Sequence, residues 1–192
     1  ADGRIGVGTA NAYTNLTGGT YGDYHRSWHT LTVGGNFTNR GTVRFTNQTT
    51  PDFQNHTSTG AVSLVFDQFR NSQMECRGLT DLYNLVVNKG VNRAYELEIF
   101  AQARNHFSIF GPNNGQWNDS NPAHPENQKA LWIQNGTLRL TGQVHIPTLT
   151  EGIRDYTIGA NAALVLDGPN VFVGNTANEN TDFASMGLSY SS

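Results

Sequence analysis

The sequence predicts an all-β protein, and in particular a single-stranded parallel β-helix in which short strands stack as a solenoid. One observation is an alternation of apolar and polar residues with a period of two, as where Glu96 and Glu98 separate Tyr95, Leu97 and Ile99. Strands with one buried and one exposed face have this pattern. The other observation is a recurring turn–strand unit, which is typical of stacked architectures.

The recurring unit occurs three times. Residues 41–46 read GTVRFT, residues 136–141 read GTLRLT, and residues 161–168 align as a looser copy with residues 135–142. Thr137 and the equivalent Ala163 are 26 residues apart, which suits one three-sided turn with a period of about 20–30 residues. The longer interval between the first two copies leaves room for about four such turns.

The bounds of each expected turn of the coil are inferred from its alternating strands and from the turn residues between them. Turns made of residues that tolerate a positive φ separate the strands, as at Asn88-Lys89-Gly90, Asn135-Gly136 and Asp167-Gly168. The frequent Asn and Thr residues suit stacked turns in which side-chain amides form ladders. Asn-Gly and Asp-Gly also occur in two-residue hairpins, so an antiparallel β-sandwich is the alternative. The expected turns cover residues 28–47, 60–76, 79–100, 105–111, 130–149 and 156–174.

The inward side chains are expected to form one core. They are the apolar members of the alternating stretches: Val43, Phe45, Leu82, Leu85, Val87, Leu138 and Leu140. The outward Arg44 and Arg139 are expected to be solvated.

The chain is predicted to be one β-helix domain over residues 1–192, and a segment of a longer protein. The ends, residues 1–27 and 175–192, lack the alternating pattern. Residues 112–129 contain three Pro and little apolar content, and they are expected to form a long loop insertion.

Composition excludes several classes of protein. Charged residues make up 14% of the chain, against about 25% in typical domains. The net charge of −3 leaves no basic face for nucleic acid. No apolar run is long enough for a transmembrane helix. Cys76 is the only cysteine, and its alternating context predicts a small buried hydrophobe.

No catalytic residues, metal ligands or cofactor site are predicted. Glu96 and Glu98 project from one strand about 7 Å apart, a separation that inverting glycosidases use, but any outward Glu-x-Glu produces it. We therefore interpret this pair as a solvated strand face. The scattered acids Asp67, Asp81, Asp155 and Asp167 are interpreted as turn-forming residues.

The candidate ligand-binding residues are three aromatic side chains. Trp117 lies in the polar insertion, and Trp132 stands between Leu131 and Ile133. If the two aliphatic neighbours are inside, the indole points out. Phe172 has the same relation to its neighbours. An outward aromatic ring offers a flat apolar platform for a sugar ring.

Three stretches resemble units of large secreted β-helix proteins of Bacteroidetes-type bacteria, which are often adhesin-like with pectate-lyase-like coils. They are residues 35–47, 74–90 and 130–140. The resemblance implies export, a bacterial cell-surface location and a multidomain parent chain. No catalytic motif of such proteins matches this sequence.

We therefore expect a secreted or cell-surface structural or adhesive module without catalytic activity. Its expected partners are surface glycans or other domains of the same parent chain, with no nucleic acid and no membrane span. The first alternative is a carbohydrate-binding or polysaccharide-degrading β-helix module. The second is a filament subunit that self-associates through strand edges.

Overall fold

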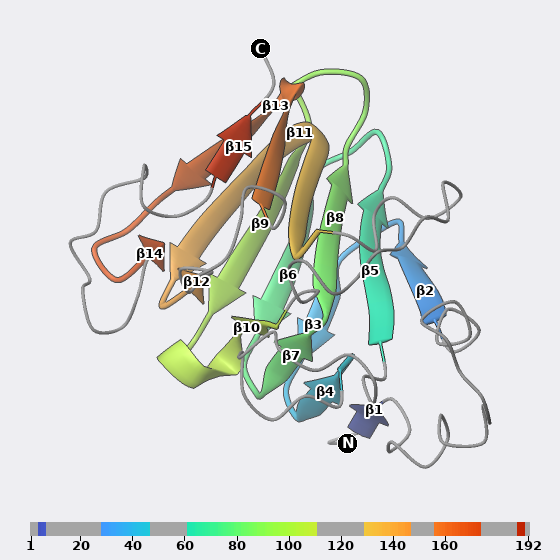
Figure 1. The fold of residues 1–192 in the computed structure, drawn as a ribbon. Helices are drawn as coiled ribbons and strands as arrows, with labels where there is room; N and C mark the ends of the chain where they lie inside the picture. The colour runs from blue at the N-terminus through green and yellow to red at the C-terminus, as the bar shows by residue number, and fades with distance from the viewer. Residues whose placement is uncertain are drawn as a thin grey trace.

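The computed structural model describes residues 4–6, 28–46, 61–110, 129–146, 156–173 and 188–190. The described part is all-β, with one short 3₁₀ turn at Arg104–His106 and no α-helix (Figure 1). The strands are β1 (Arg4–Gly6), β2 (Trp28–Val33), β3 (Phe37–Asn39), β4 (Thr42–Arg44), β5 (Ala61–Asp67), β6 (Ser72–Cys76), β7 (Thr80–Leu82), β8 (Asn84–Asn88), β9 (Glu96–Ala101), β10 (Ser108–Ile109), β11 (Leu131–Gly142), β12 (His145–Ile146), β13 (Tyr156–Leu166), β14 (Phe172–Val173) and β15 (Leu188–Tyr190).

Every strand pairing among the described residues is parallel. The chain visits three runs of strands in turn, and each visit adds one strand beside the previous one. Two of these runs begin β2–β5–β8 and β3–β6–β9, and the third is β1–β4–β7–β10. We call one passage through the runs a circuit. The antiparallel sandwich is therefore wrong for the part of the chain that the structure describes.

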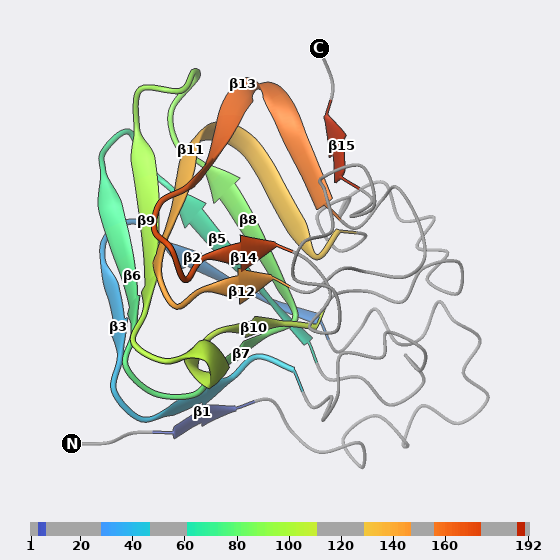
Figure 2. The same cartoon turned by 90° about the vertical axis from the view of Figure 1, so that its left-hand side faces the viewer.

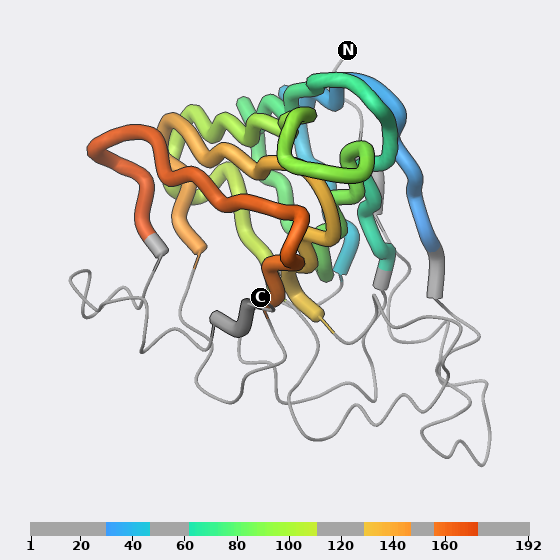
Figure 3. The backbone as a smooth tube through the Cα atoms, turned by 90° about the horizontal axis from the view of Figure 1, so that it is seen from above, coloured from blue at the N-terminus to red at the C-terminus, as the bar shows by residue number. Residues whose placement is uncertain are grey.

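The sheet is not the regular solenoid expected from the sequence. Seven strands of a nine-stranded sheet continue without a break from β2 through β11 to β3, and β13 and β15 extend it from β11. The sheet curves back on itself, so that its shape approaches a barrel (Figure 2). The cause lies in β11, whose first half pairs with β8 and whose second half pairs with β9. Its register shifts between Ile133 and Asn135, so one strand serves two runs. The view from above shows these circuits following one another along the stack (Figure 3).

The second and third copies of the recurring unit are structural equivalents. β11 and β13 pair with Thr137 opposite Ala163 and with Asn135 opposite Asn161, as their alignment predicted. The first copy is different, because it forms β4 in a separate sheet between β1 and β7. The interpretation of residues 41–46 as a counterpart of residues 136–141 is therefore wrong.

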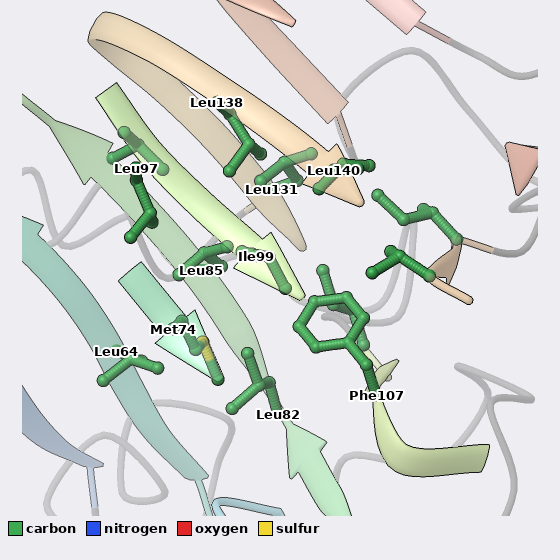
Figure 4. Close-up of a cluster of buried hydrophobic side chains, with 14 of the residues drawn as sticks. Leu64, Met74, Leu82, Leu85, Leu97, Ile99, Phe107, Leu131, Leu138 and Leu140 are labelled. Carbon is green, nitrogen blue, oxygen red and sulfur yellow. The ribbon is translucent and has the colours of Figure 1, made fainter. Parts of the chain in front are cut away.

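The core consists of in-register aliphatic rows between the runs, and Figure 4 shows its central side chains. Leu64, Leu85 and Leu131 occupy one row on β5, β8 and β11. Each is at most 1% exposed. All the inward residues predicted from the sequence are buried. Because these side chains stack on equivalent residues of the next circuit, the outward side chains of β6, β9 and β11 also lie side by side in register.

Asparagine side chains link successive circuits, as the composition predicted. Asn135 Nδ2 donates a hydrogen bond to Asn88 Oδ1 at 2.9 Å, across the pairing of β11 with β8. Asn36 Oδ1 accepts the backbone N–H of Gln73, and Asn71 Oδ1 accepts that of Glu96, both at 2.9 Å. These bonds satisfy polar groups where strands begin and hold the circuits in register.

Candidate functional site

Trp132 has the orientation predicted from the sequence. It is half-buried on β11, between Leu131 and Ile133, which are buried in the core. Lys129 places its Nζ 4.1 Å from the centroid of the indole ring, in a cation–π contact. Burial lowers the pKa of this amine. One side of the proposed platform is therefore in contact with an ammonium group.

Phe172, the other predicted ligand-binding residue that the structure describes, does not share a sheet with Trp132. Phe172 lies on β14, half-buried, in a sheet made with β12. Arg104 places its Cζ 5.3 Å from the centroid of the Phe172 ring. Trp117 and most of the predicted insertion fall outside the described residues. Trp132 and Phe172 thus belong to two different sheets.

A different set of residues is gathered on one lateral face, which we call the lateral polar face. It consists of the outward side chains of β6, β9 and β11, with Asp167 beside β13: Gln73, Glu75, Glu96, Glu98, Phe100, Thr137, Arg139, Thr141 and Asp167. Period-two alternation places these side chains opposite the core residues of the same strands.

Arg139 stands at the centre of the charged part of this face. Its Nε donates to Glu96 Oε2 at 3.0 Å, and its Nη1 donates to Asp167 Oδ2 at 2.9 Å. The hydrogen bond to Glu96, followed by the one to Asp167, raises the pKa of Arg139. Arg139 is therefore a bridge between circuits, whereas the sequence predicted a solvated side chain.

Glu98 is likewise held by neighbours on adjacent strands. Its Oε1 accepts from Thr141 Oγ1 at 2.9 Å, and its Oε2 accepts from Gln73 Nε2 at 3.2 Å. Both carboxylates of the Glu96-Leu97-Glu98 segment are thus engaged with side chains of their own sheet. This agrees with their interpretation as strand-face residues.

The interpretation of Asp81 as a turn-forming residue is wrong. It was expected beside a turn, but it lies within β7 and pairs with Arg44 Nε at 3.0 Å. Burial raises the pKa of Asp81, and the neighbouring Arg44 partly opposes this effect. The pair links β4 to β7, in the same way that Arg139 links β9 to the segment after β13.

Phe100 is a member of the lateral polar face that the sequence reasoning missed. It is half-buried and stands in register between Glu75 of β6 and Thr141 of β11. Its position two residues after Glu98 was a sufficient signal, because alternation from Glu96 and Glu98 turns Phe100 outward as well. An aromatic ring beside carboxylate and hydroxyl groups can contact both the apolar face and the hydroxyls of a sugar.

Lys89 is the other residue that the sequence reasoning missed. The run Asn88-Lys89-Gly90 was interpreted as a turn, yet the Lys89 side chain is completely buried. Its Nζ donates to Ser72 Oγ at 2.8 Å. Burial is the main cause that lowers its pKa. No sequence signal marks this lysine, because its partner belongs to a strand of the preceding circuit.

The buried thiol of Cys76 is expected to resist modification in the folded protein. Burial raises its pKa to about 11, so the reactive thiolate is scarce at neutral pH. Titration with an aromatic disulfide reagent at neutral pH should detect the thiol only after unfolding in guanidinium. Rapid labelling under conditions where circular dichroism shows a fully folded protein would contradict this placement.

The described residues include no group of three or more His, Cys, Asp or Glu side chains placed to hold a metal ion. They also include no helix that is long and apolar enough to cross a membrane. No protein-family model matches the chain, and searches of curated proteins and of solved structures found no match either.

Proposed function

We propose that this chain is a structural or adhesive module of a bacterial cell surface, exported and without catalytic activity. The observation that supports the proposal is that charged side chains pair with one another between successive circuits. Arg139, Glu96 and Asp167 join successive circuits to one another, and the Arg44–Asp81 pair does the same elsewhere. Such side chains make a stack of strands stiff and keep its register.

The finer architecture we propose is a short, irregular coil of the parallel β-helix type. The pairing of each run with its counterpart one circuit later supports it, as does the row of Asn88, Asn135 and Asn161 at equivalent positions. Stacked circuits give length and resistance to proteolysis without disulfides, which suits a presenting surface outside the cell.

The test compares stability with activity in the same variants. The purified chain is incubated with a panel of neutral and acidic polysaccharides, and the release of reducing ends or unsaturated products is measured. We expect no release, and we expect Glu96→Gln and Arg139→Gln to lower the thermal midpoint. Release that disappears in Glu96→Gln while the fold is retained would overturn the proposal in favour of an enzyme.

The cellular location is tested separately. An antiserum against the chain is used on intact bacteria that express the natural gene, before and after mild trypsin treatment. Surface exposure predicts labelling of intact cells and its loss after trypsin. Labelling that requires permeabilised cells, with a cytoplasmic protein as the matched marker, would contradict export.

Glycan binding is the second candidate function, and Phe100 favours it. This outward ring has Glu75 and Thr141 as its in-register neighbours, while Trp132 offers a more isolated ring. A glycan array should therefore report binding that is lost in Phe100→Ala and weakened less in Trp132→Ala. Binding that survives both substitutions would exclude these rings as the contact.

A further inference from the structure

The two large hydrophobic side chains that are exposed among the described residues lie at one corner of the stack. Phe69 is 63% exposed and belongs to the connection from β5 to β6, and Val91 is 67% exposed and belongs to the connection from β8 to β9 (Figure 1). Because β5 pairs with β8 and β6 pairs with β9, these two connections lie next to each other. Single exposed hydrophobic side chains are common, but two on neighbouring connections form a patch that indicates a contact surface.

The aromatic part of this patch has a fixed geometry. The ring of Phe69 meets the ring of Tyr95 edge-on, with the centroids 6.1 Å apart and the planes at 69°. Gly90 has φ of 72° and passes close to both rings. A Cβ added to Gly90 would lie 2.7 Å from Tyr95 Cδ2 and 3.7 Å from Phe69 Cδ1. Val91 follows this glycine, so it is presented beside the aromatic pair.

The connection from β8 to β9 is held in place by the next circuit. Thr137 Oγ1 donates to the C=O of Arg93 at 2.9 Å, and the N–H of Thr137 donates to the C=O of Tyr95 at 2.8 Å. Within the connection, Asn92 Oδ1 accepts the N–H of Ala94 at 2.9 Å. The tip is therefore ordered before it meets a partner, so a contact there does not bear the entropic cost of ordering a loop.

The charge of the corner is positive. Neither connection contains an acidic residue, and each has one exposed arginine, Arg70 in the first and Arg93 in the second. The acidic residues that flank the connections interact with other groups. Glu96 is held in its ion pair across β9 and β11, and Asp67 interacts with the buried amine of Lys89.

The two guanidinium groups lie on opposite sides of the aromatic pair. A Cβ added to Gly35, just before β3, would lie 2.5 Å from Arg70 Nη2, so this guanidinium covers the preceding circuit. Arg93 Nη2 donates to the C=O of Ala160 on β13 at 3.0 Å, in the direction of the last circuits. The carbonyl is neutral, so Arg93 keeps its full charge and has further N–H donors. The corner thus presents an apolar centre between two cations.

We propose that this corner docks on a lipid bilayer with anionic headgroups. Phe69 and Val91 enter the headgroup region, and Arg70 and Arg93 pair with lipid phosphates. Apolar side chains combined with cations are the groups that bind proteins to the surface of an anionic membrane. Residues 91–94 are all exposed, and such a projecting tip suits a deformable surface, whereas a small ligand needs a concave site. A stable protein partner would need a larger area than this patch.

The contact is peripheral and does not involve the lateral polar face. It goes beyond the proposed structural or adhesive function, because it names a surface that the module touches. Each arginine near an anionic surface is expected to strengthen binding about fivefold. With two arginines and two apolar side chains, the binding of one copy is expected to be weak and reversible, and screened by salt.

The test measures flotation of the chain with vesicles of phosphatidylcholine and phosphatidylglycerol in about equal amounts, and with vesicles of phosphatidylcholine alone, over a series of salt concentrations. Phe69→Ala removes the exposed ring, and Arg70→Gln removes one charge. The matched controls are Phe100→Ala, which removes another outward ring, and Arg40→Gln, which removes another exposed arginine. Circular dichroism verifies that each variant is folded.

The unsubstituted chain and both controls should float with the mixed vesicles at low salt and less so as salt rises. Vesicles of phosphatidylcholine alone should bind much less. Phe69→Ala should lower the partition coefficient about tenfold, and Arg70→Gln about fivefold.

A fluorescent label reports insertion directly. Val91→Cys labelled with an environment-sensitive dye should shift its emission to the blue on mixed vesicles. The same label on Thr38→Cys, at an exposed position of β3, should not shift. The natural Cys76 is buried and does not compete for the dye in the folded protein.

Four results would overturn the proposal. One is an unsubstituted chain that floats with no vesicle at low salt. Another is equal flotation of Phe69→Ala, Arg70→Gln and their controls. A third is flotation without any shift of the label at position 91. The last is binding of a soluble acidic polysaccharide, without vesicles, that is lost in the same two variants, because the corner would then recognise a charged polymer instead of a bilayer.

Discussion

Replacing Gly136 with alanine is expected to lower the free energy of unfolding by about 2 to 5 kcal/mol, from backbone strain and overpacking combined. Gly136 has φ of 90°, in the region that L side chains rarely adopt. An added Cβ would also lie 2.5 Å from Lys89 Cβ and 2.8 Å from the backbone oxygen of Tyr95. Because the latter is a backbone atom, the clash cannot be relieved by a change of rotamer.

Urea unfolding followed by circular dichroism measures this effect. The matched control is Gly34→Ala, because the atoms nearest to its added Cβ belong to the flexible side chain of Gln68, the nearest at 3.1 Å. Gly34 also lies outside the set of glycines with positive φ. We expect the control to stay within about 1 kcal/mol of the unsubstituted protein. A Gly136→Ala chain as stable as the control would mean that β11 can move away from the 89–95 connection.

Gly136 also shows how far the recurring unit could be interpreted from the sequence. The alignment of residues 135–142 with 161–168 predicted the register of β11 with β13 correctly. Ala162 occupies the position equivalent to Gly136, so the two copies differ in residue type at this position. The sequence places a turn residue there, but the close approach of Lys89 and Tyr95 depends on strands of an earlier circuit.

The first copy was misassigned for a related physical reason. The sequence from Gly41 to Thr46 predicts a turn followed by an alternating strand. Such a strand is compatible with any of the three runs, because each run has one buried face. What places it in β4 is pairing with β1 and β7, together with Asn39. The Asn39 amide Nδ2 donates to Thr80 Oγ1 and to the C=O of Leu79, both at 2.8 Å. These contacts are long-range, so local periodicity does not contain them.

The candidate site, too, could be predicted from the sequence only in its local features. Alternation gives the direction of each side chain, and it placed Trp132, Glu96 and Glu98 outward correctly. It does not give the neighbour across the strand. The bridge from Arg139 to Asp167 required the register of β11 with β13, and the burial of Lys89 required the contact with Ser72 of β6.

Lys89→Met is expected to stabilise the fold by about 1 to 3 kcal/mol at neutral pH, since a buried charge is replaced by an apolar side chain of similar length. Burial lowers the pKa of the Lys89 amine from 10.5, Arg70 lowers it further, and Asp67 only partly opposes them. The hydroxyl of Ser72 is a neutral partner, so it offsets little of the cost of burying an ammonium group.

The effect has a defined pH dependence. Because the folded-state pKa of Lys89 lies below its unfolded value, the unfolded chain binds more protons between these two values. The unsubstituted protein therefore becomes more stable as the pH rises through the folded pKa toward 10.5. Lys89→Met lacks this term, so its advantage is largest below the folded pKa and shrinks at alkaline pH. Urea unfolding at a series of pH values measures the difference.

A second substitution separates the hydrogen bond from the charge. Ser72→Ala removes the acceptor of the amine, and it should destabilise the unsubstituted protein by about 1 kcal/mol or more. In the Lys89→Met background the same change should be nearly neutral, because the hydroxyl no longer has a cationic donor to satisfy. Equal effects in both backgrounds would show that the two groups act independently. A Lys89→Met chain that is less stable at neutral pH would show that the ammonium is held by Asp67, and the lysine would then be an ionic link between circuits, like Arg139.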